Sequence, residues 1–517
     1  ILDDQVQGAI RKFLVKQRQT IKVRQTYDTP ASNPNTATPD LERNSKIRIL
    51  QHSVDDGATN NRLMQNKRED ETYFIPRPAD SLNHVSDPPN WERIADYVDS
   101  KLPSGVSHCI PPISENLVRS SLQQLSSGKA TGLDDLSSYF LKTAASSISP
   151  SLTAIFNLSI SSGIFPDLWK TAKVSPLHKD GSLFDRSNYR PISVLAVVSN
   201  ILERHVHQTF YNFLSQHELL LDSQFGFRSS RSCELAIVDL SDNILTNMDN
   251  KVLNGLLKRL TLWIIIRYLI NFVFMVVPIL PWLGFALIYP GVLKKTQFRG
   301  TLSEALPVSA GVPQGSILGP LFFIIHINDL PLALHSDVTS TMFADDTSVL
   351  VRGLFISSVS NQLNEVARTI STWADNNRMS LNTTKTKSLL ITTLQKRRTL
   401  TSSALNIQTD GRSIEQVDYA KLLGVMIDSD MSWEHHIDTI CCIISSRLSL
   451  LRRIKPYLNF DSALRFYNSC VNSYFIYCSA AWVTVPTISS CDSFVFRSVQ
   501  GVYSLMPTSL RLLFIYF

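Results

Sequence analysis

The sequence predicts an α/β fold, because helical and strand-like hydrophobic periodicities alternate along it. In residues 113–125 ("ISENLVRSSLQQL") apolar side chains recur every three or four positions behind Ser114, a predicted N-cap, which is typical of an amphipathic helix. Residues 171–181 ("TAKVSPLHKDG") predict a short strand that Pro176 breaks. From Leu293 to Leu394 strand-like and helical segments follow one another.

The remaining elements fit the same class. Residues 151–170 predict an amphipathic helix that ends at Gly163 and Pro166, and residues 188–214 predict an extended segment that leads into a helix. The last part of the chain predicts helices after one strand at residues 421–428 ("KLLGVMID").

Composition limits the class of protein. At 517 residues the chain exceeds one ordinary core, so two or three subdomains are expected. A net charge of +6 allows a polyanionic partner without requiring one. The seven cysteines show no CxxC spacing, which favours a reducing compartment and argues against zinc. No signal peptide opens the chain, which predicts a nuclear or cytoplasmic location, and the first residue is Ile1, as expected of a fragment or an incomplete gene model.

Two adjacent carboxylates stand between short apolar runs in "TSTMFADDTSVL", Thr339 to Leu350. Aspartate suits a tight turn better than a strand, so Asp345 and Asp346 predict a hairpin turn. Each carboxylate raises the pKa of the other unless a cation lies between them and a third group. A solvated hairpin tip and a metal-binding turn are therefore the two interpretations, and the flanking sequence has to decide between them.

Eight stretches, in order, resemble the reverse transcriptase of non-LTR (LINE-type, jockey-like) retrotransposons. The resemblance covers roughly Trp91 to Trp482 and implies a right-hand polymerase fold with fingers, palm and a helical thumb. The stretches are "GKATGLDDL", "FPDLWKTAKVSPLHKDG", "NYRPISVLAVVSNILER", "QFGFRSSRSCELAI", "GVPQGSILGPLFFIIHINDL", "FADDT", "LNTTKTKSLL" and "LLGVMIDSDMSWEHHI".

The resemblance also implies roles for individual residues. Asp345 and Asp346 would be catalytic and would bind Mg²⁺ (or Mn²⁺), two ions in an intact family member, because nucleotidyl transfer uses cations held by carboxylates. Lys385 would be the acid for the pyrophosphate leaving group. The implied partners are an RNA template, a DNA primer and deoxynucleoside triphosphates, with no specific protein partner. The residues implied in nucleotide or nucleic-acid binding are Gln314 and Gly315 of "GVPQGS" and the cations Lys173, Lys179 and Arg190.

Ordinary structural roles compete with each of these assignments. Single lysines and arginines are often solvated surface charges, "GVPQGS" also reads as a Gly/Pro turn before a helix, and "LLGVMID" reads equally well as a core strand or as the primer-grip hairpin. The predicted organisation is a basic helix and flexible linker at 1–90, fingers and the first part of the domain at 91–250, an anomalous apolar block at 251–296, palm at 297–395, and a primer-grip region and helical thumb at 396–517, truncated at its end.

An apolar block interrupts the family pattern. Leu260–Pro290 contains Arg267 as its one charged residue, and no Asp lies between Asp249 and Asp329, where the family has a palm strand with another metal-binding Asp. Permitted codons for residues 258–266 ("KRLTLWIII"), read from the third base, give Ala-Phe-Asp-Thr-Val-Asp-His-His, which is family-like. The block is therefore interpreted as a frame-shifted translation, with the codons for the first Asp lost near Asn254–Leu257.

Two other interpretations of the block stay open. It is a membrane-span candidate by hydropathy, although Pro278 and Pro281 disfavour a span and a span is not expected. The chain could also be a non-catalytic nucleic-acid-binding relic. The frame-shift interpretation predicts an inactive polymerase, weak and salt-dependent nucleic-acid binding, and an aggregation-prone product.

Overall fold

The chain forms two compact units in a computed structural model. Unit 1 comprises the described residues of Ile94–Leu219 and Ile265–Phe322, and unit 2 those of Leu220–Ile264 and Phe323–Phe517. The predicted helix within residues 1–25, the predicted linker up to residue 90 and most of the apolar block lie outside the described residues. The structure describes residues 92–482, with breaks at 104–105, 107, 186–187, 259, 261, 265–292, 299, 308–312, 378, 384, 401–402 and 410.

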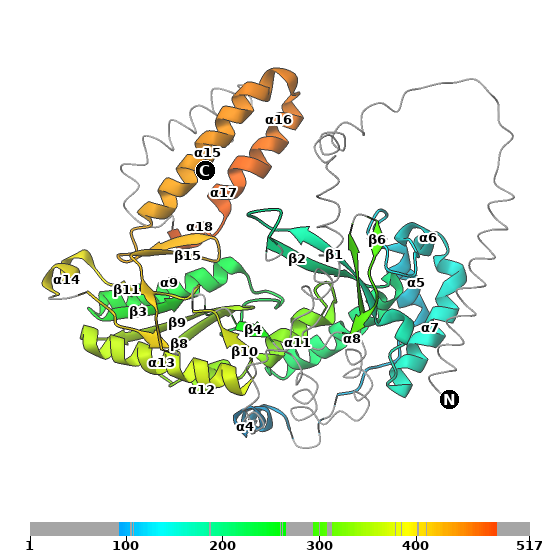
Figure 1. The fold of residues 1–517 in the computed structure, drawn as a ribbon, viewed down its shortest axis with the longest axis horizontal. Coiled ribbons are helices and arrows are strands. Elements are labelled where there is room, and N and C mark those ends of the chain that lie inside the picture. Colours follow the sequence, from blue (N-terminus) through cyan, green and yellow to red (C-terminus); the bar gives the residue numbers. More distant parts are fainter. Residues whose placement is uncertain are drawn as a thin grey trace, which may run out of the picture. The chain divides into compact units, whose positions relative to one another are not determined.

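Unit 1 is built on a mixed sheet. β1 (Thr171–His178) pairs with β2 (Tyr189–Val194) antiparallel and with β5 (Leu293–Phe298) parallel. Ala172 and Val174 are buried while the residues between them are half-exposed, so helices cover one face of β1. The other elements of unit 1 (Figure 1) are β6 (Thr301–Leu302), β7 (Leu306–Pro307), α4 (Glu92–Lys101), α5 (Glu115–Gln123), α6 (Ser138–Thr143), α7 (Ala145–Ser162), η2 (Asp167–Trp169) and α8 (Val197–Gln216).

Several predicted elements of unit 1 are confirmed. Ser114 caps α5, because its side chain accepts a hydrogen bond from Leu117 N at 3.3 Å. α7 ends at Gly163, whose φ of +68° is the left-handed conformation of a helix C-cap. The prediction that Pro176 breaks the first strand is wrong. Pro176 lies inside β1 opposite Pro191 of β2, so two residues that cannot donate to a ladder share one cross-strand position.

Unit 2 is a sandwich around a five-stranded sheet with the strand order β14-β11-β3-β9-β8. α9 (Cys233–Asp249) and the β15–β16 hairpin pack on one face of this sheet, and α13 (Ile356–Asn376) packs on the other. The five strands are β3 (Leu253–Lys258), β8 (Thr339–Phe343), β9 (Asp346–Gly353), β11 (Lys387–Ile391) and β14 (Glu415–Gln416).

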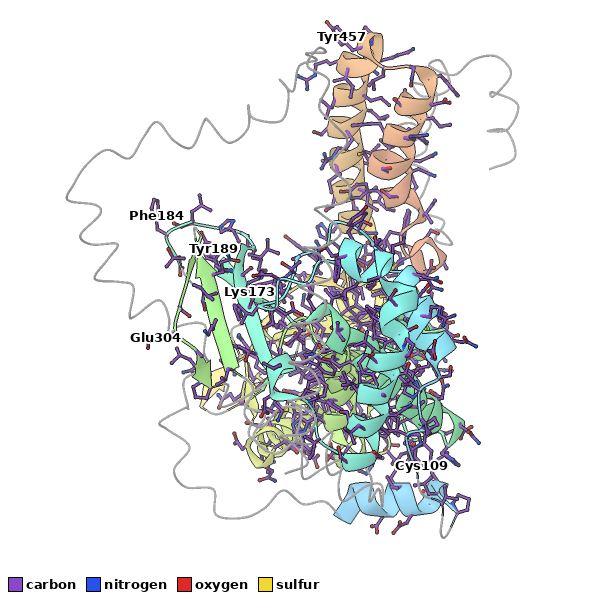
Figure 2. All side chains as sticks on the ribbon, turned by 90° about the vertical axis from the view of Figure 1, so that its right-hand side faces the viewer. Cys109, Lys173, Phe184, Tyr189, Glu304 and Tyr457 are labelled. Carbon is purple, nitrogen blue, oxygen red and sulfur yellow. The ribbon has the colours of Figure 1, made fainter. Side chains whose placement is uncertain are left out.

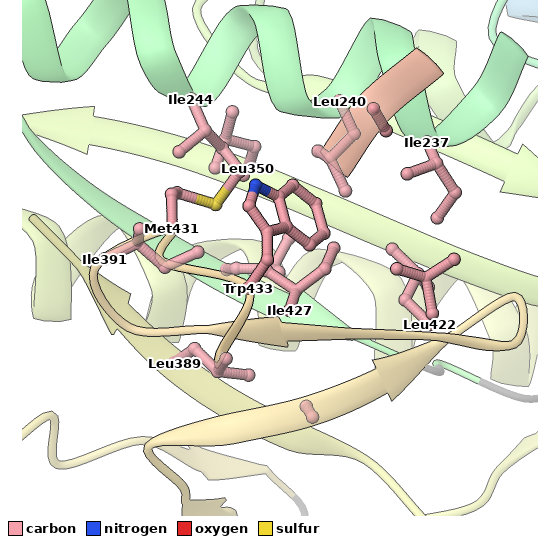
Figure 3. Packing of buried hydrophobic residues seen from close by; sticks show 14 of the residues in the cluster. Ile237, Leu240, Ile244, Leu350, Leu389, Ile391, Leu422, Ile427, Met431 and Trp433 are labelled. Carbon is pink, nitrogen blue, oxygen red and sulfur yellow. The ribbon is translucent and has the colours of Figure 1, made fainter. Parts of the chain in front are cut away.

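The apolar core of unit 2 lies between α9, the sheet and the hairpin of β15 (Tyr419–Leu422) and β16 (Val425–Asp428). Trp433 is 1% exposed and lies among side chains from all three layers (Figure 3). It also directly precedes α15 (Glu434–Ile454), so this core fixes the beginning of that helix. The labelled residues around Trp433 are Ile237, Leu240, Ile244, Leu350, Leu389, Ile391, Leu422, Ile427 and Met431.

The strand β3 corrects the sequence interpretation of residues 251–296. The first residues of that range are an ordinary central strand, because β3 pairs with β9 on one side and β11 on the other and all six of its residues are buried. Gly255 permits close packing on α13, since a Cβ there would lie 2.4 Å from Val359 Cγ1. The disruption predicted within residues 251–296 stays a prediction for the residues after β3.

A helical arm follows the core of unit 2. α15, α16 (Phe460–Tyr467) and α17 (Ser473–Ile476) pack through a separate apolar cluster that includes Ile444 and Tyr467, and Tyr457 lies at the end of the arm (Figure 2). Among the described residues, no helix combines the length and the apolar character needed to cross a membrane. The remaining elements are β4 (Leu262–Ile264), α11 (Leu318–His326), α12 (Leu330–Ala333), β10 (Met379–Leu381), α14 (Leu394–Thr399), β12 (Gln408–Thr409), β13 (Arg412–Ser413), η5 (Lys455–Tyr457), η6 (Asn468–Asn472) and α18 (Ser479–Trp482).

Candidate active site

The predicted hairpin turn with two carboxylates is confirmed in unit 2. Phe343 of β8 pairs with Asp346 of β9, so Ala344 and Asp345 form the two-residue connection. Ala344 has φ +54°, the left-handed conformation that tight hairpin turns need. Asp345 is exposed and Asp346 is half-buried. Both carboxylates therefore stand at one end of the sheet; this hairpin connection with Asp346 is called the acidic turn below.

The segment before α9 supports the acidic turn, which sequence reasoning did not foresee. Phe225 N donates to Met342 O at 2.7 Å, and Met342 N donates to Ser223 O at 2.8 Å. The buried side chain of Gln224 accepts through Oε1 from Gly226 N at 2.8 Å and from Ala344 N at 3.1 Å. Both donors are backbone N–H groups, so the amide oxygen must face them. Gln224 thus provides the hydrogen-bond acceptor for the backbone N–H of Ala344, the left-handed residue of the turn.

Gly226 allows this segment to approach the turn closely. A Cβ at position 226 would lie 2.3 Å from Ala344 N, a distance that no side chain can occupy. The motif "QFGFR" contains Gln224 and Gly226, but the sequence alone does not show that this motif contacts the "FADD" turn.

An apolar residue, Leu260, follows β3 and contacts the backbone of β9 next to the acidic turn. Leu257 and Val349 are the last pair of β3 and β9 in the described residues. Leu260 N donates to Thr347 O at 3.0 Å, and its side chain is fully buried. The prediction that the codons for a further Asp were lost near Asn254–Leu257 stays a prediction.

The acidic turn offers two carboxylates, those of Asp345 and Asp346. Within the part of the chain that the structure describes, no group of three or more His, Cys, Asp or Glu side chains could hold a metal ion. Mg²⁺ in polymerase sites is held by one or two carboxylates together with water and substrate phosphates, so the prediction that Asp345 and Asp346 bind metal stays a prediction.

Lysines gather at the same end of the sheet. Lys258 ends β3 and Lys387 begins β11, where the two residues pair. The buried Lys258 donates from Nζ to Lys421 O at 2.8 Å, while Lys387 makes an ion pair with Glu415. Lys385, the predicted acid, lies two residues before β11 and is exposed, so the topology places it at the end of the sheet that carries the acidic turn.

In unit 1, the described part of "GVPQGS" is a loop held at two points. Ser193 N donates to Gln314 O at 2.7 Å, and a Cβ on Gly315 would lie 2.1 Å from Ser193 O. Gly315 has φ +134°, a conformation that favours glycine. The loop therefore follows the end of β2 closely and leaves Gln314 exposed. Gly311 and Val312 of the motif lie outside the described residues.

A buried carboxylate fixes the other end of this loop, and sequence reasoning missed it. Glu203 of α8 is 2% exposed and accepts from Ser316 Oγ at 3.0 Å and from Ile317 N at 2.8 Å. Burial raises the pKa of Glu203, and the hydrogen bonds from Ile317 and Ser316 partly oppose that rise. Glu203 thus satisfies the first N–H groups before α11.

The three cations predicted to bind nucleic acid belong to the β1–β2 hairpin of unit 1. Leu177 pairs with Arg190, which is exposed, and Lys179 follows β1. Lys179 Nζ lies 3.9 Å from Asp180 Oδ2, and Lys173 Nζ donates to Gly132 O at 3.5 Å. Figure 2 shows Phe184, which is 99% exposed, near the tip of this hairpin and Lys173 nearer its base.

Comparison with known families identifies this arrangement. Residues 177–427 match the family described as Reverse transcriptase (RNA-dependent DNA polymerase), and this range runs from β1 to β16. These residues form a reverse transcriptase domain.

The relatives place the reverse transcriptase domain among those of jockey-like non-LTR retrotransposons. The probable RNA-directed DNA polymerase from transposon BS of Drosophila melanogaster is 26% identical over 440 residues, which cover 81% of this chain and 48% of the relative. The corresponding protein of transposon X-element is 25% identical over 404 residues (76% and 43%), and that of mobile element jockey is 26% identical over 366 residues (67% and 38%). The chain thus spans less than half the length of each of these relatives.

A reverse transcriptase domain implies the palm, fingers and thumb of a polymerase, and the mixed α/β architecture agrees with that. The family generally uses divalent metal ions and acts on an RNA template with nucleotide substrates.

Proposed function

We propose that this chain is the RNA-directed DNA polymerase portion of a jockey-like non-LTR retrotransposon protein. The sheet of unit 2 is its palm, the β1–β2 hairpin of unit 1 belongs to its fingers, and the arm of α15–α17 is its thumb. The support is the sequence match over residues 177–427 together with the carboxylate pair at a hairpin turn of an antiparallel sheet. The substrates of this portion are an RNA template, a DNA primer and deoxynucleoside triphosphates.

The predicted site residues take their roles from this assignment. Asp345 and Asp346 are the palm carboxylates, and Lys385 is a proton donor at the same end of the sheet. Gln314 and Gly315 form a loop surface for the nucleotide and the template base, since both residues are exposed while the loop backbone is held against Ser193. Lys173, Lys179 and Arg190 neutralise phosphates of the template or the nucleotide.

The chain in its present form binds template and primer but does not extend the primer. The observation that carries this conclusion is that no Asp lies between Asp249 and Asp329, where the family has a palm strand with another metal-binding Asp. Phosphoryl transfer depends on positioned charge, so the loss of one ligand position removes the main source of catalysis.

The experiment combines binding with primer extension on the whole chain. A fluorescent DNA primer annealed to an RNA template should show salt-dependent anisotropy changes but no extension with either Mg²⁺ or Mn²⁺ present. Extension that Asp345→Asn abolishes would show that the palm is catalytically intact. Absence of template–primer binding would contradict the assignment as a polymerase portion.

Metal binding tests the acidic turn directly. Asp345→Asn should weaken the binding of Mn²⁺, measured by electron paramagnetic resonance, because it removes one of the two carboxylates of the turn. An unchanged Mn²⁺ affinity in the folded Asp345→Asn variant would contradict the assignment of Asp345 as a metal ligand.

We further propose that the apolar block Leu260–Pro290 is translated in a shifted reading frame. The codons permitted for residues 258–266 encode a family-like segment in that frame. Sequencing the gene and its transcript across residues 250–297 tests this proposal. An uninterrupted open frame that encodes the apolar block in related intact copies would contradict it.

A further inference from the structure

The palm sheet has a second charged end, opposite the acidic turn. β3 begins, β9 ends and β11 ends there, since Asn254 pairs with both Arg352 and Ile391. Arg352 is six residues along β9 from Asp346, which corresponds to about 20 Å at the rise of a strand. This end therefore lies well away from the acidic turn.

Five cations gather at this end. Lys251 lies two residues before β3, Arg352 lies near the end of β9, and α14 after β11 contributes three more. Lys396 Nζ donates to Lys251 O, which places α14 against the beginning of β3 (Figure 1). The cations, called the basic end below, are Lys251, Arg352, Lys396, Arg397 and Arg398.

Arg397 fixes α14 against the neighbouring chain segments by hydrogen bonds. Its guanidinium donates to Leu390 O and to Ser429 O, both at 3.2 Å. In the described part of the chain, none of the other four cations makes an ion pair. Two carboxylates are near these cations: Asp249 is two residues before Lys251, and Asp430 follows Ser429, whose carbonyl oxygen Arg397 contacts. Because five cations outnumber these two carboxylates, positive charge predominates at the basic end.

This arrangement suits a polyanion and not a single small anion. The cations come from the ends of three neighbouring strands, spaced by about 4.8 Å, so they form a row of about 10 Å across the sheet. Arginine and lysine that make no local ion pair can neutralise consecutive phosphates without breaking existing contacts. Leu394 is the large apolar side chain exposed on α14, so binding there would go through phosphates and not through base stacking.

We infer that the basic end is a second nucleic-acid surface, which holds a single strand through its phosphates outside the polymerase site. It would bind the part of a long template, or of a displaced strand, that extends beyond the template–primer duplex. Binding there does not depend on the acidic turn, so it is expected whether or not the chain can extend a primer.

The test compares two double variants of the full chain. Arg352→Glu with Arg398→Glu reverses two exposed charges at the basic end, and Arg368→Glu with Arg412→Glu reverses two exposed charges elsewhere in unit 2 that also lack ion pairs. The probes are labelled 30-nucleotide single strands of RNA and of DNA, and a short blunt RNA–DNA hybrid. Anisotropy is measured between 50 and 200 mM KCl.

The first variant should bind the single strands about tenfold more weakly at low salt, and its log–log salt slope should fall by about 1.4, the value for two phosphates on a single strand. Its affinity for the blunt hybrid and the behaviour of the control variant should not change. Equal losses in both variants would overturn the inference. Failure of the wild-type chain to bind the hybrid would instead contradict the proposed function, and competition by polyglutamate as strong as that by RNA would assign the surface to an acidic protein.

Discussion

Gln224 shows how much of the site depends on one side chain. Its amide oxygen accepts from two buried backbone N–H groups, one of which belongs to the left-handed residue Ala344. Gln224→Ala leaves both donors without an acceptor, so we expect the free energy of unfolding to fall by about 2–4 kcal/mol. Urea denaturation of the variant measures this loss.

A matched variant separates this effect from loss of volume. Gln224→Glu keeps an oxygen acceptor for both N–H groups and should unfold closer to wild type than Gln224→Ala. If the two variants are equally destabilised, the hydrogen bonds to the turn are not the cause.

Glu203 gives a prediction on pH. Burial raises its pKa above the ordinary value of 4.5, so the folded state favours the protonated carboxyl more than the unfolded state does. Its favourable contribution is complete below pH 4.5 and is lost as pH rises through the folded pKa. Glu203→Gln keeps an acceptor for Ile317 N without the charge, so it should gain stability relative to wild type as pH rises from 4.5 to 7. A stability difference that does not change with pH would contradict this.

At the scale of elements, the loop after β7 depends on contact between backbones. Gly315→Ala combines a positive φ (+134°) with a Cβ only 2.1 Å from Ser193 O, while Gly300→Ala also has a positive φ (+82°) but open space around its Cβ. We expect Gly300→Ala to cost about 1 kcal/mol of unfolding free energy from backbone strain, and Gly315→Ala to cost clearly more. Thermal denaturation of the two variants gives the difference, and equal costs would show that the loop can move away from β2.

The beginning of the thumb helix α15 depends on Trp433. Trp433→Ala removes a fully buried indole from the core between α9, the sheet and the β15–β16 hairpin, so we expect a loss of about 3–5 kcal/mol. Limited proteolysis should then cleave near the beginning of α15 sooner than in wild type. Tyr457→Ala, at the exposed end of the same arm, is the control and should leave both measurements unchanged.

Sequence patterns identified the elements that local chemistry determines. Examples are Gly163 at a helix end, Ser114 at a helix beginning and the two carboxylates of a hairpin turn. Each acts over a few residues, so the local sequence is enough to predict its role. Gln224 and Glu203 act across gaps of 120 and 114 residues. Their roles depend on long-range contacts and burial, which one sequence does not show. The strand β3 was not predicted for another reason. The unusual apolar residues after it made the predicted apolar block begin at residue 251, before this strand.

At the scale of the whole molecule, charge is the property that a binding measurement reports. The net charge of +6 on 517 residues is modest, and exposed cations lie on the β1–β2 hairpin, at the basic end and on the helical arm. We expect template–primer affinity to fall by about 10²-fold or more between 50 and 200 mM salt, because phosphate contacts release counterions. Affinity that does not change with salt would mean that apolar contacts dominate binding.

The position of β3 also has a consequence for synthesis on the ribosome. Leu256 pairs with Leu350 and with Leu389, so one partner of this central strand is made about 130 residues after it. At 5–20 residues per second, β3 would wait for roughly 7–26 seconds for its last neighbour. During that time an apolar strand and the apolar residues that follow it are exposed together, so a nascent chain of this sequence is a strong candidate for holding by a chaperone.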